Sequence, residues 1–521
     1  MNQNTYPKNI AQIVSQVREP IHIVLNKHTQ RYEPVLAKEI STDPLQQENL
    51  IATLPPLYPE WLGDANFLAT HQLRFPYVVG EMANGIASAE CVIAAVKSGF
   101  MGSFGAAGLM PDVVEKNLQK IYQQLQSFSG WGANLIFNPN EPALEEATVN
   151  LFLRFGIQRV SASAYMSLSP FIVHYAFSGL HTDSQGNICR RNHVLAKISR
   201  VEVAKLFMTP VPGELLAQLV SQGKLTQQEA DLAKNLPVAE DITAEADSGG
   251  HTDNRPLGAL FPVIQHLAAQ MTEKHGYAQP LRVGAAGGLG TPTAVAAAFA
   301  MGAAYVLTGS VNQAAVEAGI CPKAKAMLAE ADMTDVEMAP AADMFELGVK
   351  LQVLKRGTLF SRRALKFYEL YVKYPTLEAI PAEEKANLEE KCFHATLEEV
   401  WKNTRAFFAA RDPRQVTLAE QNPKHRMALV FRSYLGLSSR WAISGDESRR
   451  LDYQLWCGPA MGAFNDWVKG SFLETLENRT VQQIGYNLLE GAAVITRAAQ
   501  LRSYGVAVPL SAFEFIPRPL G

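Results

Sequence analysis

The sequence lacks most of the features that identify simple classes of protein. Its five cysteines are scattered and have no CxxC spacing, which argues against a disulfide framework or zinc site and favours a cytoplasmic protein with reduced thiols. The 47 basic and 50 acidic residues leave a net charge of −3, which gives no bulk argument for binding nucleic acid or an anionic membrane. HExxH, GxxxxGK[ST] and GxSxG motifs are absent, and no carboxylate cluster has metal-ligand spacing, so no metal site is expected.

Long hydrophobic runs are also missing. Residues 1–8 have no apolar signal core, and the longest apolar run, 294–309, is interrupted by Gly302. That run predicts a buried helix followed by a buried strand, not a membrane span. With 521 residues, 47% of them hydrophobic, the chain suits a globular protein that has a barrel of about 250 residues and a second unit.

Short apolar strands alternate with amphipathic helices between residues 76 and 308. This rhythm predicts an α/β protein with a (β/α)₈ TIM barrel, in preference to an open doubly wound sheet, which usually has fewer strands. We expect strands at 77–80, 100–105, 133–137, 159–163, 194–199, 241–247, 282–286 and 304–308.

The rest of the chain departs from this rhythm. We expect an N-terminal extension over 1–75, the barrel over 76–320, and a mainly helical region over 321–521 whose last helices could pack back on the barrel. Residues 208–240 are polar and helical, which predicts a helical insertion between the fifth and sixth strands. The insertion could bind a partner, but an inert surface insertion is favoured because loops tolerate insertions.

Catalytic groups of such barrels lie at the carboxyl ends of the strands. His251 follows the sixth strand behind Gly249 and Gly250, which let the backbone approach a ligand and turn the imidazole toward the mouth. The alternative is a structural histidine. Lys197 lies inside the apolar fifth strand, where a lysine is costly unless it is paired. It could place positive charge beside a developing anion, such as the N1–C2=O edge of a reduced flavin, or it could reach water from the strand end.

Glycine turns follow the last two strands, at Gly287–Gly288 and Gly309–Ser310. Loops at these positions form the recurrent phosphate site of TIM barrels, which predicts a phosphate-bearing cofactor or substrate. After the first strand, the loop that begins at Gly80 could run flat against a planar ring or simply form a tight turn. Asn138, after the third strand, could bind a ring edge or serve as a helix cap or Asx turn.

Several of these segments resemble the PfaD-type enoyl reductases, which act in trans on polyketide synthases and polyunsaturated-fatty-acid synthases. These reductases belong to a wider nitronate-monooxygenase-like group. The similar segments are 79–86, 102–108, 246–256, 284–290, 456–467 and 487–493. Gly-Gly-His-Thr-Asp-Asn-Arg-Pro, at 249–256, is specific for the subfamily because the wider group has Gly-Gly-His-x-Gly.

The resemblance implies FMN in a TIM barrel beneath a C-terminal helical lid, with NADPH or NADH as reductant. The enzyme would reduce the α,β-double bond of an enoyl thioester on acyl carrier protein, and a homodimer is plausible. Two alternatives stay open: a nitronate monooxygenase, in which the same histidine abstracts a proton, and a non-catalytic docking component of a synthase without flavin.

The resemblance also implies roles for individual residues. His251 would polarise or protonate the substrate, and Lys197 would support the flavin. Gly80, Met82, Asn84 and Asn138 would frame the isoalloxazine, and Gly249, Gly250, Gly287, Gly288, Gly309 and Ser310 would complete the cofactor site. Asn254 and Arg255 could meet the pantetheine of the carrier or the phosphate of NADPH.

Overall fold

The structure, a computed structural model, describes residues 10–39, 49–126, 129–139 and 141–521. Eight parallel strands close into a barrel in the order β10-β11-β13-β14-β4-β5-β6-β7. Each overlaps one predicted strand, so the predicted TIM barrel is confirmed. The strands are β4 (Tyr77–Val79), β5 (Met101–Phe104), β6 (Trp131–Ile136), β7 (Arg159–Ser163), β10 (His193–Ile198), β11 (Asp241–Glu245), β13 (Arg282–Ala286) and β14 (Val306–Thr308).

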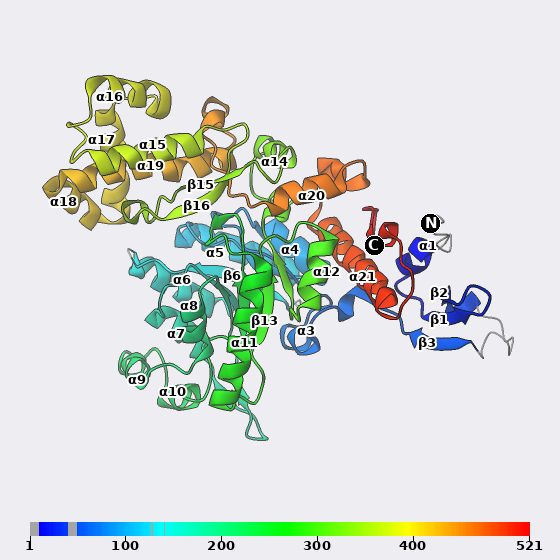
Figure 1. The fold of residues 1–521 in the computed structure, drawn as a ribbon. Helices are drawn as coiled ribbons and strands as arrows, with labels where there is room; N and C mark the ends of the chain where they lie inside the picture. Colours follow the sequence, from blue (N-terminus) through cyan, green and yellow to red (C-terminus); the bar gives the residue numbers. More distant parts are fainter. Residues whose placement is uncertain (1–9, 40–48, 127–128, 140) are drawn as a thin grey trace.

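Helices surround the barrel and begin at recognisable caps. Ser88 and Thr291 accept hydrogen bonds from the backbone three residues ahead, and proline opens four of the helices. The seven helices that follow strands β4 to β13 are α4 (Ala89–Lys97), α5 (Pro111–Leu125), α6 (Pro142–Arg154), α7 (Pro170–Phe177), α8 (Val201–Met208), α11 (Leu257–His275) and α12 (Pro292–Ala300). Helices such as α6, α8 and α11 lie around the barrel (Figure 1).

A helix from the far end of the chain closes this ring. Strand β14 is followed only by the four-residue α13 (Ser310–Gln313), and α21 (Val481–Ser503) packs against α12 and α4 instead. Two glycines permit the close approach: a Cβ at Gly485 would lie 2.5 Å from Phe100, and one at Gly491 would lie 2.7 Å from Pro292. The outer side of α21 buries a three-stranded sheet made of β1 (Ile21–Asn26), β2 (Arg31–Leu36) and β3 (Leu50–Leu54).

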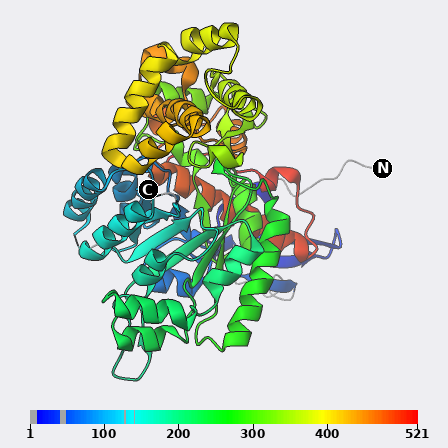
Figure 2. The same ribbon diagram turned by 90° about the vertical axis from the view of Figure 1, so that its left-hand side faces the viewer.

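Two helical additions lie at opposite ends of the barrel (Figures 1 and 2). The predicted insertion is confirmed as a hairpin of α9 (Gly213–Ser221) and α10 (Gln227–Ala233). The helical domain at the other end contains α15 (Phe360–Lys373), α16 (Ala382–Leu388), α17 (Leu397–Arg411), α18 (Pro413–Gln421) and α19 (Pro423–Ser444). It joins the barrel through β15 (Val336–Pro340) and β16 (Lys350–Leu354). Within the described ranges, no helix has the length and apolar character needed to cross a bilayer.

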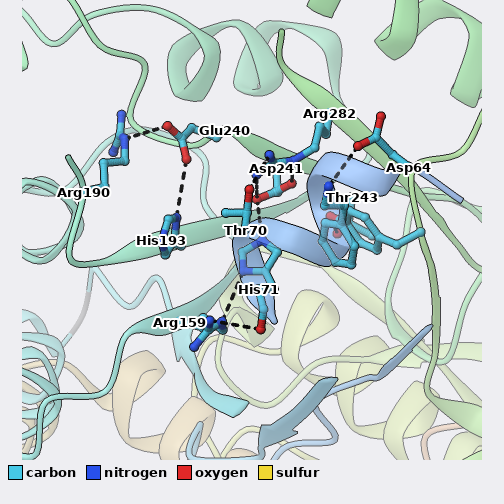
Figure 3. A network of polar contacts seen from close by, with 12 residues as sticks. Asp64, Thr70, His71, Arg159, Arg190, His193, Glu240, Asp241, Thr243 and Arg282 are labelled. Carbon is cyan, nitrogen blue, oxygen red and sulfur yellow. Dashed lines mark hydrogen bonds and ion pairs between the residues drawn. The ribbon is translucent and has the colours of Figure 1, made fainter. Parts of the chain in front are cut away.

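The amino ends of four adjacent strands carry a polar network (Figure 3). These strands begin with Arg159, His193, Asp241 and Arg282. Arg282 donates to both oxygens of Asp241 at 2.6 and 2.8 Å, and His71, the last residue of α3 (Ala65–His71), contacts the same carboxylate at 2.9 Å. The network lies at the amino-terminal end of the barrel, opposite the strand ends that are expected to carry catalysis. Residues at this end usually have a structural role.

The contacts of His71 define its protonation. Arg159 Nε donates to His71 Nδ1 at 3.1 Å, so Nδ1 has no hydrogen and Nε2 carries the proton given to Asp241. Burial lowers the pKa of His71 from 6.5 to about 4, although the charge of Asp241 acts in the opposite direction. His71 is therefore a neutral, buried hydrogen-bonding residue at neutral pH.

Candidate active site

A cavity of about 1590 Å³ lies between the mouth of the barrel and the helical domain. Every barrel strand contributes to its wall, at or just beyond its carboxyl end, through Glu81, Ala107, Phe137, Ser163, Ser199, Glu245, Gly287 and Gly309. The opposite wall includes Val400, Asn403, Thr404 and Phe407 of α17 and Leu437, Arg440 and Trp441 of α19. The cavity therefore joins the carboxyl ends of the strands to an accessory domain.

Most residues singled out in the sequence come together in this cavity. Those that line it are Met82, Asn84, Asn138, Lys197, Gly249, Gly250, His251, Gly287, Gly288, Gly309 and Ser310. Gly80, Asn254 and Arg255 are not among the lining residues. Gly80 is buried against β14, and a Cβ there would lie 2.6 Å from Leu307, so packing explains this glycine.

Asn254 and Arg255 lie in the loop after β11, outside the cavity wall, and their expected role toward the pantetheine or NADPH stays a prediction. The Asn254 amide donates to Asp247 Oδ1 at 2.9 Å and to Gln352 Oε1 at 3.2 Å. Arg255 is exposed, and its carbonyl accepts from the Asp247 backbone N–H at 2.9 Å. Both residues thus stabilise the loop after β11 and lie outside the cavity wall.

Asn138 forms local hydrogen bonds with Glu141, as expected for the Asx turn that was its alternative to binding a ring edge. Its amide donates to Glu141 Oε2 at 2.9 Å, and its Oδ1 accepts from the Glu141 backbone N–H at 3.3 Å. Arg411 of α17 binds the same Glu141 carboxylate through two contacts, at 2.6 and 3.0 Å. The strand-end turn therefore anchors the helical domain as well as lining the cavity.

Lys197 is paired with two carboxylates that sequence reasoning missed. Its Nζ lies 3.4 Å from Glu81 Oε1, beyond β4, and 3.2 Å from Glu245 Oε1, at the end of β11. Burial favours the neutral amine, but the charges of Glu245 and Glu81 outweigh it and raise the pKa of Lys197 above its usual range. The lysine is therefore paired with two carboxylates, as a lysine within an apolar strand requires.

Glu81 is itself held by the barrel. Ser161 and Ser163 of β7 donate to its Oε1 at 2.6 and 3.3 Å, and its Oε2 is buried without a hydrogen-bond partner among the described residues. An unsatisfied buried acceptor in a cavity wall suits a ligand that brings a donor. Across the same described residues, no group of three His, Cys, Asp or Glu side chains could hold a metal ion.

His251 faces the cavity from a strand outside the barrel. It belongs to β12 (Gly250–His251), which pairs antiparallel with β16. Its Nε2 lies 3.2 Å from Asp343 Oδ1, in the segment after β15. Burial lowers the pKa of His251, but the hydrogen bond and charge of Asp343, with the charge of Glu245, raise it more, so the net pKa lies above the ordinary value.

The glycine turns after β13 and β14 leave their backbone exposed to the cavity. Gly287 has φ +87, and a Cβ there would lie 2.6 Å from the Ala246 carbonyl carbon, so only glycine fits this turn. No atom lies within 4 Å of a Cβ placed at Gly288 or Gly309, so open space adjoins both. Ser310 Oγ accepts from the Gly458 backbone N–H at 3.1 Å and keeps its own hydrogen available for a ligand. These groups suit a phosphate.

Comparisons with known proteins place the chain in a family. The chain is 45% identical over 449 residues to one component of the polyunsaturated fatty acid synthase of Thraustochytrium sp. and 43% identical over 464 residues to polyketide biosynthesis protein PksE of Bacillus subtilis. These matches cover 85% and 89% of this chain, which spans only 30% and 60% of those two proteins. Residues 374–453 match a family model described as the inserted helical domain of [acyl-carrier-protein] S-malonyltransferase.

A solved structure extends the likeness to three dimensions. The enoyl reductase domain of MlnA, from the macrolactin biosynthesis cluster of Bacillus amyloliquefaciens, is 36% identical, with a TM-score of 0.81 over 85% of this chain and 99% of that one. The closed barrel and the site at its mouth define a TIM-barrel protein of the nitronate-monooxygenase-like group. Within that group, the chain belongs to the PfaD-type enoyl reductase family of polyketide and polyunsaturated-fatty-acid synthases, as its motifs predicted.

Proposed function

We propose that the protein is an FMN-dependent enoyl reductase that acts in trans. Its substrate would be an α,β-unsaturated acyl thioester on the acyl carrier protein of a polyketide or polyunsaturated-fatty-acid synthase, and NADPH or NADH would be the reductant. One observation carries the proposal: His251, Lys197 and two phosphate-suited glycine turns face a single cavity in a chain that spans 99% of the MlnA enoyl reductase domain.

The residues present fit FMN. Gly288, Gly309 and Ser310 offer open backbone and a hydroxyl donor for its phosphate. The unpartnered Oε2 of Glu81 could accept a ring N–H, and Asn84, in the loop expected to frame the ring, also lines the cavity. When bound, the flavin would supply a hydride for the β-carbon of the enoyl group. The residues around it would orient the reactants and exclude water.

His251 and Lys197 have different tasks in this proposal. Hydride addition creates enolate charge on the thioester oxygen, and the α-carbon must then gain a proton. His251, at the cavity wall, would polarise the thioester or supply that proton. Lys197, held by Glu81 and Glu245, would give a fixed dipolar contact to the flavin, because its charge is already compensated.

The helical domain would receive the acyl chain. The cavity is larger than the roughly 300–1,000 Å³ that one bound ligand usually occupies, so it has room for a cofactor and a substrate. Apolar side chains line its outer part, and Phe407 and Leu437 are each 42% exposed there. An acyl chain that covered these side chains would gain hydrophobic contact.

Spectroscopy and anaerobic kinetics test the proposal. The purified protein should be yellow or should bind FMN on titration, and NADPH or NADH should bleach the flavin. An enoyl thioester on acyl carrier protein, or on a short pantetheine surrogate, should then reoxidise it without oxygen. Failure of enoyl thioesters together with oxygen uptake on nitroalkanes would instead establish a nitronate monooxygenase. A protein that binds no FMN would fit only the alternative of a docking component.

A further inference from the structure

The backbone of His251 is fixed by the segment that follows the barrel. Gly250 pairs with Gln352 and His251 with Leu351, so β12 forms the edge of the antiparallel sheet β12-β16-β15. Gly249 adds to this contact, because a Cβ there would lie 2.8 Å from the Cys457 backbone nitrogen. The accessory sheet and the Cys457 segment therefore determine where the histidine main chain lies at the barrel mouth.

The same sheet brings a carboxylate to the imidazole. Strand β15 ends at Pro340, and Asp343 then places Oδ1 3.2 Å from His251 Nε2. Both residues line the cavity, and His251 Nδ1 makes no hydrogen bond to the described residues. A carboxylate can only accept, so Nε2 carries a hydrogen and Nδ1 is the ring nitrogen free for a substrate.

We propose that Asp343 is a positioning residue for His251: it holds the imidazole through Nε2–H and stabilises the imidazolium, so that Nδ1–H delivers the proton to the substrate α-carbon. This inference rests on the proposed function. As the hydride and its two electrons reach the β-carbon, the enolate forms. The Nδ1–H bond then breaks, the Cα–H bond forms and the thioester carbonyl is restored. The neutral imidazole regains a proton from water.

Charged groups on three other elements also affect this pair. Glu245 of β11 favours the imidazolium, whereas Lys197 of β10 opposes it. Arg432 of α19 faces Asp343 and favours its carboxylate form. Asp343 makes the direct contact with the imidazole of His251. Burial disfavours the charged form of both residues, but these groups together outweigh it, so the pKa of His251 is raised and that of Asp343 is lowered. The imidazolium therefore persists to higher pH than it would in an ordinary histidine.

The first test reads the ionisation of His251 directly. We would titrate the FMN-loaded protein, labelled with ¹³Cε1-histidine, by NMR and assign the His251 signal with His251→Gln. Asp343→Asn should lower the titration midpoint by about one pH unit, and Asp343→Glu should restore most of it. Asp335→Asn, which alters an ion pair with Arg356 near the start of β15, is the matched control and should leave the midpoint unchanged.

The second test reads catalysis. In the alkene half-reaction of pre-reduced enzyme, Asp343→Asn should be about tenfold slower than wild type at pH 8 and within about twofold at pH 5.5, because one pKa unit changes the protonated fraction tenfold at high pH. Reduction of the flavin by nicotinamide should not change. Adding Asp343→Asn to His251→Gln should cause no further loss.

Several outcomes would overturn the inference. An unchanged His251 midpoint and pH profile in Asp343→Asn would show that the carboxylate does not act on the imidazole. A further loss in the double variant, or a loss of FMN that Asp343→Glu does not restore, would make Asp343 a structural residue only. If wild-type enzyme does not reduce enoyl thioesters, the proposed function fails, and the NMR titration still decides whether Asp343 controls His251.

Discussion

Replacing His71 with glutamine should make the stability of the protein less dependent on pH. His71 is fully buried with a pKa of about 4, against 6.5 for an ordinary histidine, so between these values the unfolded chain binds more protons than the folded one. The stability that neutral His71 contributes is full above pH 6.5 and is lost as the pH falls toward 4. The whole shift corresponds to about 3 kcal/mol, of which about 2 kcal/mol is lost by pH 5.

Urea unfolding, followed by tryptophan fluorescence and circular dichroism at pH 5.0, 6.0 and 7.5, measures this effect. His71→Gln should be less stable than wild type at pH 7.5, because it loses hydrogen bonds to Asp241 and Arg159. That deficit should shrink by about 2 kcal/mol at pH 5. His266→Gln, which changes an exposed histidine of α11, is the control. Equal pH dependence in wild type and His71→Gln would refute a neutral, buried His71.

Three further predictions concern the site. Gly309→Ala should weaken FMN binding at least about tenfold in a fluorescence titration, because the added methyl would enter the space assigned to phosphate. The thermal midpoint of the apoprotein should not fall, because φ at Gly309 is −111. The control Gly258→Ala, also beside open space, should bind FMN normally. Lys197→Met should cost about 3 kcal/mol in urea unfolding because one buried and one partly buried carboxylate lose their cation. Adding Glu245→Gln should recover part of that loss, and no recovery would contradict the pairing. His251→Ala should slow alkene reduction while FMN stays bound, and an unchanged rate would remove His251 from the mechanism.

The barrel could be predicted because its signal is local. Strands of parallel sheets are short apolar runs, and at least one helix separates each from the next. The closing helix α21 could not be placed in the ring from sequence, because it begins only at Val481, whereas the last barrel strand ends at Thr308. It also packs through glycines that have no distinctive local pattern. The sequence allowed for the last helices to pack back on the barrel but did not indicate that α21 would contact α4 and α12.

The candidate site also contains residues that could be predicted from the sequence and one that could not. Lys197 could be selected as a charged residue inside an apolar strand. His251 and the glycine turns could be selected because they follow strands, and the carboxyl ends of parallel strands meet at one mouth. Glu81 and Glu245 occupy equivalent positions, and an acidic residue at the end of an apolar strand was the signal that could have identified them. Asp343 had no such signal, since it reaches His251 from 92 residues away through the pairing of β12 with β16.

The alkene half-reaction tests the central claim most directly. FMN-loaded protein would be reduced anaerobically with NADPH or NADH, separated from nucleotide, and mixed with an enoyl thioester on acyl carrier protein while flavin absorbance is followed. The proposed function predicts stoichiometric reoxidation and a saturated acyl product that carries deuterium at both the α- and the β-carbon when the reaction is run in D₂O, because the N5 hydrogen of reduced flavin exchanges with solvent. Flavin that stays reduced until oxygen is admitted, with the enoyl thioester recovered intact, would contradict it.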